Sequence, residues 1–318
     1  MFEVVKKLLL IPALLCCLCV FAQDSLMVAH QPPTISANNK TRLYLATAAS
    51  VVGYGGSLVA LSNVWYKKYA QSSFHFFNDN NDWLQMDKAG HFFSAYTAGR
   101  FSMEAWKWAG ASRKQSIWIG GLSGTAFLTV IEILDGFSAE WGFSPGDMLA
   151  NLTGSATFIS QQLAWDEQRI QIKFSFHRID YGDASLNQRA DQLFGNRLVE
   201  RMLKDYNGQT YWVSVNLKSF FKQSHLPSWL NISLGYGADG MFGGSSNTAK
   251  DNNGNIIFSR QDISRYRQWY IAPDIDLTRI RTKSKFLRTT FYLFNSIKFP
   301  TPSIGFSKKG VEWNWIHF

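Results

Sequence analysis

The sequence predicts an α+β protein, with a helical membrane-associated bundle followed by a β-rich antiparallel domain. Long apolar segments with few charges fill the first half, and segments of alternating apolar and polar residues fill the second. The composition is 46% hydrophobic and 15% aromatic, which is typical of proteins that meet a membrane interface. We expect four regions: a signal peptide (1–22), a polar leader (23–40), the helical domain (41–165) and the β-rich domain (166–318).

The first 22 residues have the pattern of an export signal. Lys6 and Lys7 precede the apolar run "LLLIPALLCCLCVF", which is too short for a stable membrane anchor. We expect cleavage after Ala22, with an uncleaved N-terminal anchor as the alternative. No small residue stands directly before Cys16, Cys17 or Cys19 except another cysteine, so we expect no lipidation. The three cysteines lie inside this signal, so the mature chain is predicted to have no disulfide and no cysteine-bound metal.

The charge is distributed unevenly along the chain. Residues 23–164 carry 9 basic and 9 acidic side chains, whereas residues 165–318 carry 21 basic and 13 acidic ones. In an exported protein a basic half favours membrane lipid or lipopolysaccharide as partner over nucleic acid. The alternatives are an envelope protein partner or a solvated basic surface without a partner.

Four segments of the first half are predicted to be helical. Three of them, 43–65, 114–137 and 145–165, contain few charges and are rich in small residues. Such a composition suits close packing between helices. The segment from Lys114 contains Gly120 and Gly124 four residues apart. A soluble bundle with unusually apolar helices is the alternative to a membrane-associated one. The predicted segments are 43–65, 87–109, 114–137 and 145–165.

The second half is predicted to consist of strands around one helix. In "IQIKFSFH", apolar residues alternate with polar ones, which is the pattern of a half-buried strand. Further strands are expected in "YWVSVNLK", "WLNISLGYG", "WYIAPDIDLT", "FLRTTFYLF" and "GVEWNWIHF", with a hairpin turn at "KDNNGN". A helix over 184–206 interrupts the regular spacing of strands that an outer-membrane barrel requires. We therefore expect a barrel-like sheet that rests on the membrane.

Three polar pairs interrupt the apolar helices. Each pair is spaced by three or four residues, so its members share one helical face. The pairs are Asp87 and His91, Glu132 and Asp135, and Asp147 and Asn151. Because lone charges in so apolar a setting are costly, we expect the pairs to face one another in one buried cluster.

The segments that carry these pairs resemble a known family. "DKAGHF", "EILD" and "FSPGDMLANLTG" are similar to motifs of an uncharacterised bacterial family called predicted periplasmic lipoproteins, and more distantly to VanZ-like membrane proteins. The resemblance covers roughly residues 40–165. It implies a helical domain of the cell envelope and no established reaction. The chain departs from the family in its cysteines and in its long β-rich tail.

The cluster allows a metal, a catalytic or a structural role. Asp87, His91, Glu132, Asp135 and Asp147 are the candidate ligands of a divalent metal, because carboxylates with one imidazole suit Zn, Mn or Fe. His91 is a candidate general base oriented by Asp87, with Glu132 beside it. In the structural alternative Ser144 and Asp147 form a capping box and His91 hydrogen-bonds Glu132.

These features predict an exported envelope protein that binds lipid or a membrane-protein partner. The alternative is a metal- or histidine-dependent enzyme acting on an envelope lipid or glycan carrier. We expect it at the outer membrane or its periplasmic face, with the inner membrane as the alternative.

Overall fold

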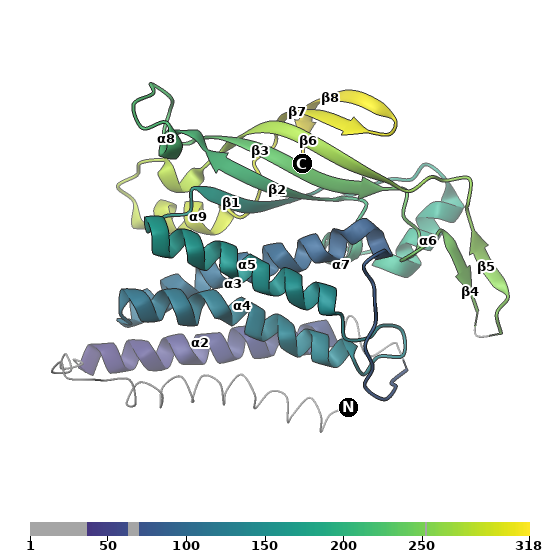
Figure 1. The fold of residues 1–318 in the computed structure, drawn as a ribbon, viewed down its shortest axis with the longest axis horizontal. Coiled ribbons are helices and arrows are strands. Elements are labelled where there is room, and N and C mark those ends of the chain that lie inside the picture. The colour runs from purple at the N-terminus through teal and green to yellow at the C-terminus, as the bar shows by residue number, and fades with distance from the viewer. Residues whose placement is uncertain (1–36, 63–69, 252) are drawn as a thin grey trace. The chain divides into compact units, whose positions relative to one another are not determined.

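A computed structural model describes residues 37–62, 70–251 and 253–318. The predicted signal peptide and residues 23–36 of the predicted leader lie outside this range, and residues 37–40 of that leader are helical. The chain divides into two compact units: residues up to Asn78 with Ser94–Asp166, and Asp79–Phe93 with Glu167–Phe318. The predicted α+β class is confirmed, since helices precede an antiparallel sheet (Figure 1).

Four long helices are found where the sequence predicts them. Ser112 begins one with a capping box that includes Gln115, and Ser144 with Pro145 begins another, so local sequence sets both starts. Within the described residues, Lys40–Leu61 and Arg113–Asp135 are long and apolar enough to cross a membrane. The helices are α2 (Ala37–Leu61), α3 (Met86–Ala109), α4 (Arg113–Asp135) and α5 (Pro145–Trp165).

Glycines on α4 allow close contact with α3, as the small-residue spacing predicts. A Cβ atom on Gly120 would lie 2.5 Å from the backbone nitrogen of Met103, and one on Gly124 would lie 2.6 Å from the carbonyl oxygen of Ala95. Both obstacles are backbone atoms, which cannot rotate away. On another side of α4, Thr125 donates a hydrogen bond to the carbonyl of Asn151 on α5 at 2.9 Å.

The second unit contains a six-stranded antiparallel sheet in the order β1-β2-β3-β6-β7-β8 and a separate hairpin of β4 and β5. The hairpin turn is at the predicted "KDNNGN", where Asp251 accepts from the backbone of Asn253 and Asn255. The strands are β1 (Ile170–Phe176), β2 (Gln209–Asn216), β3 (Leu230–Asp239), β4 (Thr248–Lys250), β5 (Ile256–Ser259), β6 (Tyr266–Ile275), β7 (Thr301–Ser307) and β8 (Gly310–His317).

The sheet is strongly curled. Lys173 on β1 and Asp274 on β6 form an ion pair of 2.6 Å, although three strand spacings of about 4.8 Å separate their strands along the sheet. Ser296 and Lys298, which precede β7, hydrogen-bond the backbone of Phe174 at the edge of β1. The described strands β1 and β8 are not paired, so the curled sheet does not close into a barrel.

Short helices complete the second unit, and three of them correct the predictions. "FLRTTFYLF" forms the helix α9 (Lys285–Phe294) rather than a strand, because Ser284 caps it through the amide of Leu287. The helix predicted over 184–206 is divided, because Gly195 has a φ of +81° that ends the first part. The parts are α6 (Ala184–Phe194) and α7 (Leu198–Lys204), and the remaining short helices are α8 (Leu217–Phe220), η2 (Asp82–Gln85) and η3 (Leu277–Arg279). β7 was not predicted.

The glycine contacts predict a measurable difference between two glycine-to-alanine changes. Gly120→Ala should lower the free energy of unfolding by about 1–3 kcal/mol, because its Cβ meets the backbone of α3. Gly53→Ala on α2 has no atom within 4 Å of its Cβ and should be neutral or stabilising by about 0.5–1 kcal/mol. Thermal unfolding in mild detergent, followed by circular dichroism, measures both. Equal effects of the two changes would contradict close packing at Gly120.

Candidate functional site

The three predicted polar pairs lie on three helices. Asp87 and His91 occupy the first turns of α3 and are half-buried, as is Asp135 at the end of α4. Glu132 on α4 is buried, and so are Asp147 and Asn151 on α5. Carboxylates so well shielded from water are retained only where other groups compensate their lost hydration.

Glu132 stabilises the start of α5. Its Oε2 accepts a hydrogen bond from the backbone nitrogen of Ser144 at 3.1 Å, and Ser144 Oγ accepts from the backbone nitrogen of Asp147 at 3.1 Å. In a full capping box the Ser144 amide would donate to the side chain of Asp147. Here it donates to Glu132 instead, so the predicted capping box does not explain the carboxylate of Asp147.

Glu132 and Asp147, which both belong to the first unit, bring their carboxylates together. One carboxylate oxygen of Glu132 and one of Asp147 lie within 4.8 Å of each other. Two ligands of one zinc ion, each about 2.0–2.2 Å from it, lie at most about 4.4 Å apart. A small movement of the side chains would therefore let both carboxylates bind one ion, and the part of His91, which belongs to the second unit, stays a prediction. Among the described residues, Asp135 belongs to no such group, although the sequence placed it in the predicted metal site.

Asp79 and Asp87, which both belong to the second unit, also bring carboxylate oxygens within 4.8 Å of each other. Lys88 Nζ lies 2.8 Å from Asp79 and 3.5 Å from Asp87, so an ammonium group already compensates these two carboxylates. This pair is therefore a weaker cation site than Glu132 with Asp147.

The backbone directly before α3 is strained. Trp83, Leu84 and Gln85 have φ angles of +47°, +50° and +68°, which are uncommon for residues other than glycine. Trp83 donates its backbone N–H to the carbonyl of Gly244 at 2.8 Å, and the hydroxyl of Tyr236 donates to the carbonyl of Leu84. These contacts within the second unit hold the segment that precedes Asp87 and His91.

The polar face of the sheet is buried, which the alternation in β1 did not predict. The sequence indicated that the isoleucines and phenylalanines of "IQIKFSFH" form the buried face, yet Gln171, Lys173 and Ser175 are at most 4% exposed. Ile172 is also 4% exposed, so both faces of β1 are covered. Lys173 and Asp274 have no exposed side-chain surface. Polar alternation alone cannot tell which face is inside, and only the partners of these side chains reveal it.

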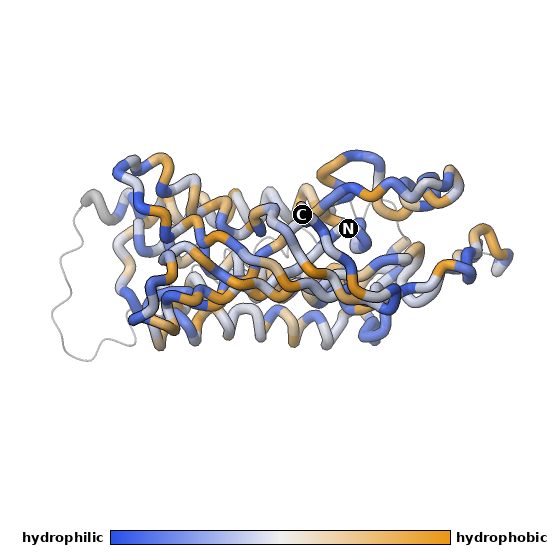
Figure 2. The backbone as a smooth tube through the Cα atoms, turned by 90° about the horizontal axis from the view of Figure 1, so that it is seen from above, coloured by the Kyte–Doolittle hydropathy of each residue, from blue (hydrophilic) through white to orange (hydrophobic). Residues whose placement is uncertain are grey.

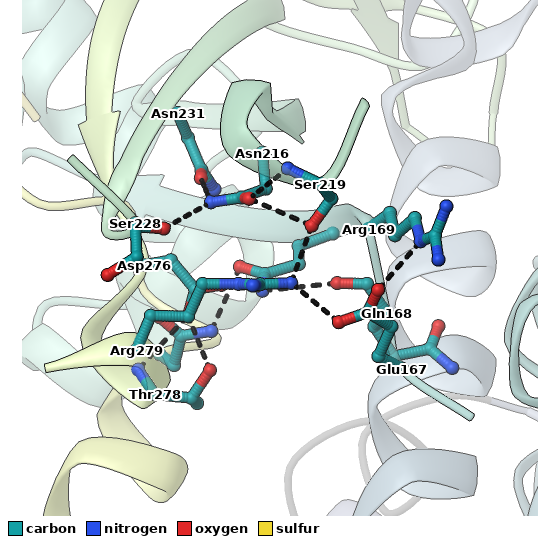
Figure 3. Close-up of polar contacts among 12 residues, drawn as sticks. Glu167, Gln168, Arg169, Asn216, Ser219, Ser228, Asn231, Asp276, Thr278 and Arg279 are labelled. Carbon is teal, nitrogen blue, oxygen red and sulfur yellow. Dashed lines mark hydrogen bonds and ion pairs between the residues drawn. The ribbon is translucent and has the colours of Figure 1, made fainter. Parts of the chain in front are cut away.

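Buried and partly buried hydrogen bonds join residues at the ends of β1, β2, β3 and β6 (Figure 3). Arg279 donates to Glu167 at 2.8 Å and to Ser219 at 2.6 Å, and lies 3.2 Å from Asp276. Asn216 donates to Asn231 at 2.8 Å. Since these groups satisfy one another, they make a polar interior stable.

The opposite face of the sheet is apolar and exposed. Val213, Leu234, Ile271, Ile304 and Trp313 are paired in register across β2, β3, β6, β7 and β8. Each is exposed, so together they form a continuous apolar row across five strands. We call this surface the outer face; it also includes Ile232, Trp269, Phe306, Val311 and Trp315, which are likewise exposed. Hydrophobic and hydrophilic positions alternate along the strands in Figure 2.

A family model described as predicted periplasmic lipoprotein (DUF2279) matches residues 75–161. The matched range contains all three polar pairs and none of the sheet. The match fits an exported protein of the cell envelope with a periplasmic location. The predicted absence of lipidation falls on residues outside the described part, and the VanZ-like resemblance stays a prediction. No curated protein and no solved structure matches the chain.

The buried lysines of the sheet predict a dependence of stability on pH. Burial lowers the pKa of Lys298 to about 8, while Asp274 raises it and Lys173 lowers it further. Between this value and the ordinary lysine pKa of 10.5, the unfolded chain binds more protons than the folded chain. The free energy of unfolding should therefore rise with pH across this window, by the order of 1–3 kcal/mol.

Lys298→Met should abolish most of this rise, although it also removes hydrogen bonds to Phe299 and Thr301 and lowers stability at every pH. Urea unfolding in mild detergent at several pH values between 7 and about 10.5 measures the slope for both proteins. The same slope in the two proteins would show that Lys298 does not titrate in this range.

Proposed function

We propose that the protein is an envelope component that lies against a lipid bilayer through the outer face of its sheet. The observation that carries the proposal is the reversed polarity of the sheet. Lysine, aspartate and asparagine side chains lie inside beside Trp212 and Tyr270, while Leu234, Trp269 and Trp313 face outward and are each more than half exposed. Water-soluble sheets bury the apolar side, whereas β proteins in lipid present it outward.

The size and composition of the outer face support lipid as its occupant. Proteins that stay monomeric in water rarely expose a continuous apolar surface over several strands, because its hydration is unfavourable. Tryptophan is enriched where hydrocarbon meets headgroups, since its ring is apolar and its N–H is polar. Trp269, Trp313 and Trp315 supply such rings on β6 and β8.

The unpaired edge of the sheet limits how deeply the outer face can enter the bilayer. Backbone N–H and C=O groups of an unpaired strand cannot lie in hydrocarbon without a large loss of free energy. β8 is an edge strand of the described sheet. The proposal is therefore a sheet that lies on the membrane surface, with its outer face at the boundary of headgroups and acyl chains. The periplasmic face of the outer membrane is the proposed location.

Spin labels on single cysteines test this contact, because the chain has no cysteine after Cys19. Leu234→Cys and Ile271→Cys place labels on the outer face, and Ile256→Cys places a matched label on the exposed β5 of the hairpin. Cys16, Cys17 and Cys19 are replaced by serine in all proteins. In proteoliposomes, labels at 234 and 271 should be more accessible to oxygen than to a water-soluble nickel chelate.

The label at 256 should show the opposite preference. Because accessibility is read at single positions, anchoring of the chain by α2 does not affect the outcome. Labels at 234 and 271 that are as accessible to nickel as the label at 256 would contradict lipid contact.

A second candidate function is a metal-dependent enzyme acting on an envelope lipid or glycan carrier. The observation that favours it is that carboxylate oxygens of Glu132 and Asp147 lie within 4.8 Å of each other in the first unit. His91 is the third ligand that the sequence predicts. One imidazole with two carboxylates suits Zn, Mn or Fe, and leaves further coordination positions for water or substrate. An ion held there would activate water or polarise a phosphoryl oxygen. Asp87, one turn before His91, remains the candidate that orients it.

Metal content of the purified chain tests this second candidate. The wild-type protein, dialysed after incubation with zinc or manganese, should retain about one ion per chain. Glu132→Gln should lose it while keeping an oxygen that accepts from the Ser144 amide, so thermal unfolding should change little. Asp135→Asn, outside the group, is the control and should retain the ion. No retained ion in the wild type, or equal retention in Glu132→Gln, would exclude this site.

A further inference from the structure

Helix α9 has an apolar face that no residue of the described structure buries. None of its ten residues is classed as buried. Phe286, Leu287, Leu293 and Phe294 are exposed by 76%, 41%, 51% and 56%. At 100° per residue these four side chains lie on one side of the helix, and Lys285, Arg288 and Thr289 lie on the other. An apolar stripe of this kind on a globular protein normally faces a core.

The charge around α9 has a single sign. No aspartate or glutamate occurs between Asp276 and Glu312, a stretch that includes α9 and β7. Four basic residues accompany the helix, and their side chains are exposed: Arg281, Lys283, Lys285 and Arg288. They are concentrated before the helix and in its first turn. A surface that binds both these basic residues and the apolar face of α9 must therefore carry negative charge beside an apolar layer.

We propose that α9 is an interfacial helix that binds the surface of a bilayer containing anionic phospholipid. Its phenylalanine and leucine side chains enter the acyl region, and its lysine and arginine side chains contact the lipid phosphates. This arrangement is the one that amphipathic helices with basic polar faces adopt at membranes. Lysine and arginine reach the headgroups through long aliphatic stems, so the helix can lie flat while its charges stay in water.

The inference rests on the proposed function and adds a lipid class and an element that recognises it. Contact of the outer face with a bilayer requires only hydrocarbon, so it should not depend on the charge of the lipid headgroups. α9, in contrast, depends on phosphates that carry a net negative charge. An acidic protein partner could neutralise the basic residues. Binding to such a partner would not require Phe286 and Phe294 of this ten-residue helix to be exposed.

The experiment places an environment-sensitive fluorophore on single cysteines of the full chain in proteoliposomes. Leu293→Cys reports on the apolar face, Thr289→Cys on the opposite side of the same helix, and Leu234→Cys on the sheet. Vesicles consist of phosphatidylcholine alone or with phosphatidylglycerol added. The label at 293 should emit at shorter wavelength and at least twofold more strongly when phosphatidylglycerol is present. The label at 289 should change little.

Exposed charges are then removed without touching the apolar face. Lys283→Gln, Lys285→Gln and Arg288→Gln together should weaken insertion of α9, by about fivefold for each charge removed. High salt should have the same effect in the wild type. Lys308→Gln with Lys309→Gln, at the other end of β7, is the control and should leave the signal at 293 unchanged.

The outcomes separate the two proposals. A lipid-exposed label at 234 with a label at 293 that stays in water, whatever the lipid, overturns the inference about α9 and leaves the proposed function standing. Labels at 234 and 293 that both stay in water overturn both. A label at 293 that is equally shielded in phosphatidylcholine, phosphatidylglycerol and detergent shows that protein covers the apolar face, and also overturns the inference.

Discussion

The ion pair between Lys173 and Asp274 is the contact on which the second unit depends. It joins β1 to β6 across a sheet in which two strands lie between them. A flat sheet would hold these strands about 14 Å apart, so the pair can form only if the sheet curls. Once the sheet curls, one face becomes an interior of limited volume and the other becomes an exterior. The polar side chains of β1 and β6 determine which face of the sheet becomes the interior.

A charged interior is costly unless every group has a partner, and here the partners come from distant parts of the chain. Ser214 donates to Asp274 at 2.6 Å, and Lys298 reaches the same carboxylate at 4.0 Å. Lys298 also lies 5.0 Å from the ring centre of Trp212, where a cation is attracted by the aromatic face. Breaking such a set would leave a charge without compensation, which is strongly unfavourable. The interior therefore holds these polar groups beside Trp212 and Tyr270, while the aliphatic residues of β2, β3 and β6 are left on the outer face.

The long helices of the first unit pack differently from the sheet, because α4 contacts α3 through backbone atoms at glycine positions. Gly120 and Gly124 remove side chains where α4 meets α3, and Thr125 with Ser155 forms a buried hydrogen bond of 2.8 Å where α4 meets α5. Small and hydroxylated residues at helix contacts are usual where lipid surrounds the helices, because hydrocarbon offers no hydrophobic driving force for their association. Glu132 then ties the end of α4 to the start of α5 through the amide of Ser144.

Local sequence determined the helix starts, the strand periods and the three polar pairs, because caps, glycine spacing and alternation act over a few residues. It also predicted that the pairs meet; within the first unit, Glu132 and Asp147 bring carboxylate oxygens within 4.8 Å of each other. Tertiary structure alone decided three features: which face of the sheet is inside, that Glu132 rather than Asp147 accepts from Ser144, and that "FLRTTFYLF" is a helix. The first two depend on partners far away in the chain. The third depends on the balance between a Ser284 cap and side chains that favour strands, which local propensity does not settle.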